Sequence, residues 1–405
     1  MRILAATLVV SAVAATAGFA ATNLDLEMGA VLGKALFERD WVPAPASTDS
    51  ADGLGPLFSA RSCSGCHAGP ALAARFTEAQ EGKVAGRGLV VRFGDAEGHA
   101  DPVYGSLLQN QAVQGMMPEG RIVLTTAADP HAPLDVSLTL DRGPLDAKTR
   151  QSVRVAPPLA GRALLDKIDE AAVLALADPD DGDGDGISGR ARMLDAGGMP
   201  MLGRYGWKAG TTGLDDQIAD AFASDLGLSS ARRPFSHGDC TEAETDCLAA
   251  PMGDSARHSG HELSEDMIEV VAAYLQSLPA PKRAADRSAG AALFAATGCA
   301  ACHAPAMPAS DGGSAAAYTD LLLHDMGPAL DDGVGARGVA SAEWRTAPLI
   351  AMSGGAGRRY LHDGRAPTLD AAIRAHGGEA DAARRRYLAL SDDERNALVA
   401  FVGGL

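Results

Sequence analysis

Apolar residues recur at helical spacing in two segments from different halves of the chain, residues 263–278 and 390–405. The apolar positions are Val271, Tyr274, Leu275 and Leu278 in the first segment and Leu398, Phe401, Val402 and Leu405 in the second. Each segment begins near a serine that is followed by acidic residues, which is typical of a helix N-terminus. Ser391 and Glu394 also have the spacing of a capping box. We therefore predict a helix in each segment.

Other patterns predict strands and a second type of helix. Residues 88–93 and 134–140 are rich in β-branched and other apolar residues and are bounded by loops rich in Gly and Asp, so we predict strands there. Phe58 and Phe294 each belong to an apolar pair that lies five residues before a cysteine. We predict that each pair belongs to an apolar helix leading into that cysteine.

The two halves of the chain resemble each other. Residues 154–159 resemble residues 345–349, and residues 207–218 match residues 362–373 without gaps in spacing. Together with the paired helices, these matches indicate an internal duplication whose halves divide near the Pro-containing linker 279–282. The predicted division is a signal peptide over residues 1–20, a first domain over 21–279 and a second domain over 280–405.

The N-terminus has the features of an export signal. Arg2 precedes an apolar run over residues 3–17, and small residues then offer a cleavage site after Ala20. The alternative, a membrane anchor, needs about 20 apolar residues, which is longer than this run. We expect cleavage, a periplasmic location and no membrane insertion afterwards.

Charge limits the classes of partner. The chain has 405 residues, with 35 Lys and Arg against 52 Asp and Glu, which gives a net charge of -17. Binding to nucleic acid or to an anionic membrane surface is therefore disfavoured, because both need cationic side chains. A basic protein partner remains open.

Six cysteines occur as three pairs, and two of these pairs are followed directly by a histidine. The two C-x-x-C-H motifs consist of Cys63, Cys66 and His67, and of Cys299, Cys302 and His303. Two thiols one helical turn apart can add to the two vinyl groups of one porphyrin, and the histidine that follows can bind the iron. We predict two covalently bound haem c groups.

The same cysteine pairs have two alternative uses. A four-cysteine zinc site or two redox dithiols would use the same pairs, but neither needs a histidine directly after the second cysteine. The third pair, Cys240 and Cys247, has no adjacent histidine and lies in a polar segment, which predicts a local disulfide. Taken together, the motifs and the repeat predict a mainly α fold of two cytochrome c-like domains from an internal duplication, with β-containing insertions in the first.

The chain resembles the di-haem oxidoreductase family, whose members are described as thiol oxidoreductases or peroxidases. This family falls within the bacterial di-haem cytochrome c peroxidase and MauG-type superfamily. The resemblance covers essentially the whole mature chain. It is carried by residues 53–58, 101–105, 203–209, 320–328 and 360–366.

The motifs assign His67 and His303 as the proximal iron ligands. The resemblance implies that the second ligand of the C-terminal haem follows a short helix, where methionine or tyrosine is common in the superfamily. The matching residue in this chain is His376. The alternatives for this ligand are Met326, His324 and His362.

The internal alignment matches His376 to Ala221 in the first half. Because alanine cannot bind iron, we expect an open coordination site on the N-terminal haem. Met116 and Met117 are the alternative ligands there. An iron with an open site can bind peroxide, whereas a six-coordinate iron mainly transfers electrons.

The resemblance also implies residues around the open haem. A distal glutamine and acid are matched by Gln217 and Asp225, although the peroxidases have Glu at the acidic position, which gives a longer reach for proton transfer. Trp207 matches the tryptophan that lies between the haems in the superfamily. The alternatives are solvated helix surface for Gln217 and Asp225, and core packing for Trp207.

A D-x-D-x-D-G pattern begins at Asp181 and is typical of calcium loops. The predicted ligands are the carboxylates of Asp181, Asp183 and Asp185 and the carbonyl group of Ile187. An arginine stands where an EF-hand has its last glutamate, so full EF-hand geometry is not expected. Asp178, Asp180 or Ser188 could complete the set, and the alternative is a solvated acidic turn.

We expect a periplasmic di-haem oxidoreductase of cytochrome c peroxidase type. Electrons from a small redox protein would pass from the C-terminal haem to an open N-terminal haem that reduces hydrogen peroxide. The alternative is a non-catalytic di-haem electron carrier that serves a periplasmic redox or metal-uptake partner. A third hypothesis, oxidation of a thiol or a protein side chain, has no free thiol in the sequence to support it.

Overall fold

The computed structural model describes residues 27–47, 51–78, 84–126, 134–279, 288–353 and 357–405. Helix accounts for 29% and strand for 19%, with many small sheets, so the prediction of a mainly α fold is wrong. The predicted signal peptide and residues 280–282 of the predicted linker lie outside the described residues.

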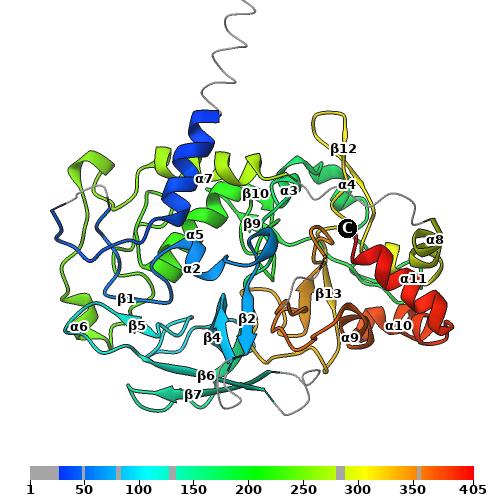
Figure 1. Ribbon diagram of the computed structural model, residues 1–405, viewed down its shortest axis with the longest axis horizontal. Helices are drawn as coiled ribbons and strands as arrows, with labels where there is room; N and C mark the ends of the chain where they lie inside the picture. Colours follow the sequence, from blue (N-terminus) through cyan, green and yellow to red (C-terminus); the bar gives the residue numbers. More distant parts are fainter. Residues whose placement is uncertain (1–26, 48–50, 79–83, 127–133, 280–287, 354–356) are drawn as a thin grey trace, which may run out of the picture.

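The described strands form seven antiparallel pairs and no larger sheet. The two longest pairs are β4 (Leu89–Gly94) with β8 (Arg150–Val155), and β6 (Gly120–Thr126) with β7 (Leu134–Leu140), which lie together in Figure 1. Both stretches predicted as strands, now β4 and β7, are confirmed. The other pairs are β1 (Leu57–Phe58) with β5 (Gln111–Ala112), β2 (Arg75–Glu78) with β3 (Val84–Arg87), β9 (Met193–Asp195) with β10 (Pro200–Leu202), β11 (Met307–Pro308) with β12 (Ser314–Ala315), and β13 (Leu323–Asp325) with β14 (Glu343–Arg345). Strands of two to four residues are too short to show an alternation of apolar and polar residues, so the sequence pattern underestimates the strand content.

Both helices predicted from apolar spacing are confirmed, as α7 (Glu265–Ser277) and α11 (Asp392–Val402). The Ser264 hydroxyl accepts a hydrogen bond from the Met267 backbone N–H, and the capping box at the start of α11 is present. The remaining labelled α-helices are α2 (Cys63–Cys66), α3 (Leu164–Lys167), α4 (Glu170–Leu174), α5 (Leu214–Leu226), α6 (Thr245–Leu248), α8 (Ser288–Ala296), α9 (Leu369–Arg374) and α10 (Asp381–Leu388). None of the described helices combines the length and hydrophobicity that crossing a membrane requires.

The two apolar pairs that precede the cysteine motifs differ. Phe294 lies in helix α8, as predicted, but Leu57–Phe58 forms strand β1 because its backbone pairs with that of Gln111–Ala112. In the first half, the helix over residues 27–38 lies beside α7 instead (Figure 1).

Two glycines allow the helices of each half to cross closely. A Cβ atom on Gly33 would lie 1.7 Å from the Val270 carbonyl oxygen, and one on Gly290 would lie 2.5 Å from the Ala397 carbonyl oxygen. The helix over residues 27–38 therefore meets α7, and α8 meets α11, with their backbones in near contact.

The apolar core has two main parts. The larger surrounds α5 and α7 and also contains residues from beyond position 280, including Met307, Leu321 and Ile350. The smaller lies around α8 and α11 and contains Phe294 and Leu398. The division of the chain at residue 279 stays a prediction.

Candidate functional site

A cavity of about 850 Å³ lies between the two cysteine motifs. Its wall contains Cys63, Cys66, His67, Cys299, Cys302, His303 and His376. The fold thus brings both predicted haem attachments and the predicted additional ligand to the same cavity.

Each motif closes into one helical turn. The His67 backbone N–H donates to the Cys63 carbonyl at 2.9 Å, and the His303 backbone N–H donates to the Cys299 carbonyl at 3.0 Å. None of the four motif cysteines, all of which the structure describes, forms a disulfide. Burial, followed by the charge of Asp225, raises the pKa of Cys63 to about 12.

The three predicted ligand histidines share one arrangement of hydrogen bonds. In each, Nδ1 lies beside a backbone carbonyl oxygen, which leaves Nε2 as the nitrogen available to a metal. This arrangement is typical of metal-bound histidines. The contacts are His67 with Leu72 at 2.8 Å, His303 with Tyr318 at 3.2 Å and His376 with Ala372 at 2.8 Å.

His303 and His376 lie close together. Burial, followed by the charge of His376, lowers the pKa of His303 to about 4. Burial also lowers the pKa values of His67 and His376. A neutral imidazole keeps the lone pair that iron needs. The paired thiols, the neutral histidines and the cavity between them therefore fit haem.

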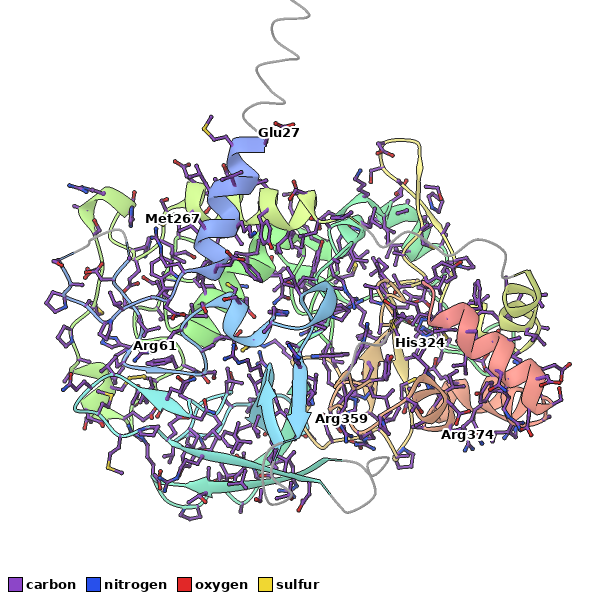
Figure 2. The ribbon with its side chains drawn as sticks, in the orientation of Figure 1. Glu27, Arg61, Met267, His324, Arg359 and Arg374 are labelled. Carbon is purple, nitrogen blue, oxygen red and sulfur yellow. A yellow bond between two sulfur atoms is a disulfide. The ribbon has the colours of Figure 1, made fainter. Side chains whose placement is uncertain are left out.

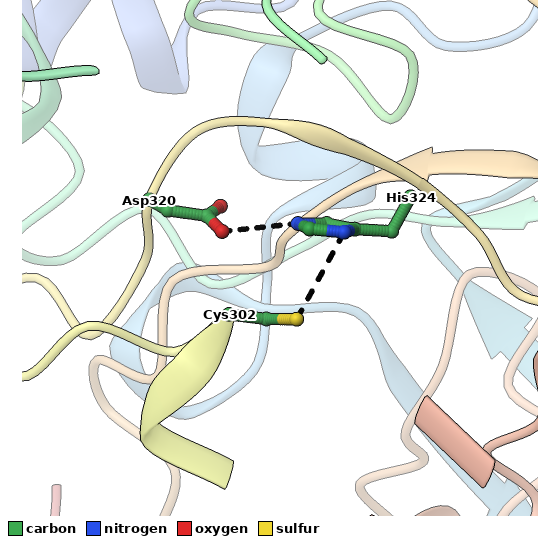
Figure 3. Close-up of side chains that lie close together, drawn as sticks. All are labelled: Cys302, Asp320 and His324. Atoms are coloured by element: carbon green, nitrogen blue, oxygen red, sulfur yellow. Dashed lines mark hydrogen bonds and ion pairs between the residues drawn. The ribbon is translucent and has the colours of Figure 1, made fainter. Parts of the chain in front are cut away.

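His324 differs from these histidines, because both of its ring nitrogens are occupied (Figure 3). Nε2 lies 3.0 Å from Asp320 Oδ2, and Nδ1 lies 2.7 Å from Glu379 Oε2 and 3.9 Å from the Cys302 sulfur. Burial alone would lower the pKa of His324, but the bonds to Asp320, Cys302 and Glu379 outweigh it and raise the pKa to about 12. A protonated imidazole cannot bind iron, so the geometry does not favour His324 as the additional ligand. Figure 2 shows His324 near the C-terminal helices.

The family model described as "Di-haem oxidoreductase, putative peroxidase" matches residues 136–405, two thirds of the chain. The chain belongs to the di-haem oxidoreductase family. No curated protein matches it. A solved structure of hydrazine synthase from Kuenenia stuttgartiensis, pressurised with 20 bar of xenon, is 21% identical. The match covers 46% of this chain and 70% of that one, with a TM-score of 0.26.

Trp207 of this di-haem oxidoreductase lies in the cavity wall beside an aromatic pair that the sequence did not reveal. The rings of His362 and Trp344 stack with 3.8 Å between their centroids, and Trp207 meets His362 edge-on at 6.5 Å. Lys208 Nζ lies 3.9 Å from the centre of the Trp344 ring. The three rings come from distant segments, so only the folded chain brings them together.

Helix α5 presents Gln217, Ala221 and Asp225 to the cavity at four-residue intervals, as expected for one helix face. The Gln217 side-chain oxygen accepts a hydrogen bond from the Thr211 hydroxyl at 3.0 Å. Burial raises the pKa of Asp225 to about 6.

The methionines considered as ligands are placed differently from one another. Met326 lies in the cavity wall with the predicted ligands. Met116 and Met117 lie instead at a smaller surface pocket, and the Met117 side chain is 65% exposed. The geometry therefore does not favour the latter two as ligands at the N-terminal motif.

Two further predicted sites are a disulfide and an acidic loop. The structure contains the disulfide between Cys240 and Cys247. In the acidic loop, carboxylate oxygens of Asp178, Asp181 and Asp183 lie within 4.8 Å of one another. The predicted set is thus only partly assembled, since the Asp185 carboxylate accepts from the Ile187 backbone N–H at 2.8 Å instead.

Sequence reasoning also missed Glu379, which joins separate segments. Its carboxylate accepts hydrogen bonds from the Ser188 hydroxyl at 2.9 Å and the Asp325 backbone N–H at 2.9 Å, besides contacting His324. Its position three residues after His376 was the signal available in the sequence.

Proposed function

We propose that this protein is a periplasmic enzyme of cytochrome c peroxidase type with two covalently attached haem c groups. The two cysteine pairs would form the thioether bonds, and His67 and His303 would be the proximal ligands. When bound, haem supplies a redox-active iron that can hold electrons and, where a coordination site is open, can bind peroxide. Membership of the di-haem oxidoreductase family supports the redox role.

The observation that carries this proposal is the unequal surroundings of the two motifs. His303 has His376 nearby, and both rings have Nε2 available. The motif at His67 instead lies near α5. Burial raises the pKa values of Cys63 and Cys66, and the charge of Asp225 on α5 raises them further. The cavity face of α5 carries Ala221, which cannot bind iron. We assign electron entry to the C-terminal motif and peroxide reduction to the N-terminal motif.

The reaction breaks the O–O bond of hydrogen peroxide and yields two water molecules. It consumes two protons and two electrons, and the electrons come from a small redox protein that is oxidised. The Gln217 amide would orient the peroxide. The Asp225 carboxylate would accept a proton from one peroxide oxygen and return it to the other, which is general acid–base catalysis. Trp207 would lie on the electron path between the motifs.

The test is peroxide reduction with an artificial electron donor, together with the spin state of the ferric protein. Because the Asp225 carboxylate must be ionised to accept a proton, the rate should rise as the pH increases through about 6. Asp225→Asn should lose most of the rate, by about 10²–10⁴-fold. Asp216→Asn is the control, because Asp216 lies on the same helix, pairs with Arg233 at 3.0 Å and lies outside the cavity wall. Two low-spin haems that do not react with peroxide would contradict the proposal and support the electron carrier.

A further inference from the structure

Three arginines in the cavity wall have no acidic partner among the residues that the structure describes. Arg162, Arg345 and Arg358 all line the cavity. Arg162 is 9% exposed and Arg345 is 8% exposed, while Arg358 is half-buried. Within the described parts of the chain, no carboxylate forms an ion pair with any of the three.

Their hydrogen bonds go to backbone carbonyls and one sulfur. Arg162 Nε donates to the Pro158 carbonyl at 2.8 Å, and Arg345 Nε donates to the Gly206 carbonyl at 3.0 Å. Arg345 Nη1 donates to the carbonyl of Thr346 at 2.9 Å, and Arg358 donates to the carbonyls of Ala351 and Ser353 and to the Met352 sulfur. A guanidinium group has five N–H donors, so each arginine keeps donors beyond these bonds.

Two neighbouring cations of the same cavity wall have no donor left for a ligand or already have an acidic partner. Arg154 forms an ion pair with Asp332, and Lys208 Nζ donates its three N–H groups to three backbone carbonyls within 3.0 Å. Burial lowers the pKa of Arg345 and the charge of Asp320 raises it, but the Asp320 carboxylate is hydrogen-bonded to His324. Within the described residues, Arg154 thus has a carboxylate partner, whereas the three arginines have none.

The charges of Arg345 and Arg358 also act on Arg162. Burial, followed by the charges of Arg345 and Arg358, lowers the pKa of Arg162 to about 9. Buried charges of one sign are costly unless an opposite charge accompanies them. Planar carboxylates match the donor fork of arginine, so an anion with carboxylate groups fits this arrangement best.

We infer that Arg162, Arg345 and Arg358 form an anion site that binds the carboxylate groups of haem. The inference rests on the proposed haem occupancy of the cavity. Haem carries two carboxylates, which would otherwise enter the cavity without partners. Burial is the main cause of the lowered pKa of His67, and the charge of Arg162 lowers that pKa further. Arg162 therefore lies near the N-terminal motif.

The same site adjoins the predicted route between the motifs. The Arg345 backbone N–H donates to the Trp207 carbonyl at 3.0 Å, while its side chain bonds to Gly206. A carboxylate held by Arg345 would therefore lie beside the Trp207 turn. A dissolved anion such as phosphate has similar hydrogen-bonding chemistry and is the competing occupant.

The test is a spectroscopic redox titration of the full-length haem-loaded protein, with Arg162→Gln and Arg345→Gln as variants. Removing a positive charge beside a haem carboxylate destabilises the reduced form, so the midpoint potential of at least one haem should shift downward in each variant. Arg345→Lys keeps the charge and should lie closer to the wild type than Arg345→Gln. Arg232→Gln removes an arginine paired with Glu265 outside the cavity wall and should leave both potentials unchanged.

Unchanged potentials in both glutamine variants would overturn the inference. A second measurement uses only the wild type and holds even if those variants do not fold. Potentials that are equal with and without phosphate, at constant ionic strength, support haem carboxylates, whereas phosphate-dependent potentials support a dissolved anion and overturn the inference. Neither titration contains peroxide, so failure of the proposed peroxidase activity does not change its outcome.

Discussion

His376 Nδ1 lies 2.8 Å from the carbonyl oxygen of Ala372, four residues earlier in the chain. This contact fixes the imidazole ring and leaves Nε2 for a metal. His67 and His303 have the same arrangement with other carbonyls, whereas His324 in the same cavity wall uses both nitrogens for acidic partners. The hydrogen-bond pattern separates histidines that can bind iron from one that cannot.

We predict that His376→Ala converts the low-spin C-terminal haem to high spin while both haems stay attached. The reason is that the substitution removes the predicted second axial ligand and leaves the cysteines of both predicted thioether motifs in place. Electron paramagnetic resonance of the ferric protein measures the change. His324→Gln is the control and should remain low-spin. A low-spin signal that survives His376→Ala would assign the ligand elsewhere, with Met326 as the first candidate.

Haem content should be two per chain in a pyridine haemochrome assay. The double variants Cys63→Ala/Cys66→Ala and Cys299→Ala/Cys302→Ala should each lose one covalently bound haem, because each removes both thioethers of one motif. Staining for haem after denaturing electrophoresis detects the covalent fraction. Zinc in place of haem in the purified protein would show that the motifs bind a metal directly.

Chelation should lower the melting temperature if the loop of Asp178, Asp181 and Asp183 binds calcium. An ion at 100 times its Kd stabilises the native state by about 2.7 kcal/mol. Asp183→Asn should reduce the effect of the chelator. Asp185→Asn should affect it less, since Asp185 lies outside this cluster. Identical melting curves of the wild type with and without chelator would identify a plain acidic turn.

Because of Glu119, the free energy of unfolding should decrease as the pH rises. Its side chain is fully buried, and burial together with the nearby Glu244 raises its pKa, despite a 2.5 Å hydrogen bond from the Gln109 backbone N–H. The folded chain therefore keeps a proton that the unfolded chain loses above about pH 4.3. Linkage then requires stability to decrease as the pH rises from there toward the raised pKa.

We predict that Glu119→Gln removes this dependence and stabilises the protein at pH 8 by about 1–3 kcal/mol relative to the wild type. Urea unfolding at pH 5 and pH 8 measures the difference, which should be larger at pH 8. Glu269→Gln, at an exposed position of α7, should change stability little at either pH. An equal gain at both pH values would mean that Glu119 does not retain a proton.

Local signals predicted the parts of this protein whose geometry is set within a few residues. Ser391 and Glu394 form their capping box, and each cysteine motif closes one turn, because the spacing itself brings the groups together. The short strand of Leu57–Phe58 depends on a distant partner, so its apolar pair was mistaken for part of a helix.

The parts of the site that the sequence concealed are those assembled from distant segments. Trp344 and His362 stack only after β14 and the segment that follows Tyr360 come together. Likewise, the absence of an acidic partner near Arg162 is visible only once the described chain is folded around it. The spacing of residues along the sequence does not show which residues from distant segments become neighbours.

The close helix crossings at Gly33 and Gly290 have a consequence for sequence variation. There the main chains lie in near contact, so the separation of the helices depends on the absence of a side chain at each glycine. A single methyl group at position 290 would push α8 away from α11 and displace Cys299, nine residues further along. The predicted attachment motif at Cys299 is thus intolerant of even the smallest side chain at a position well outside the motif itself.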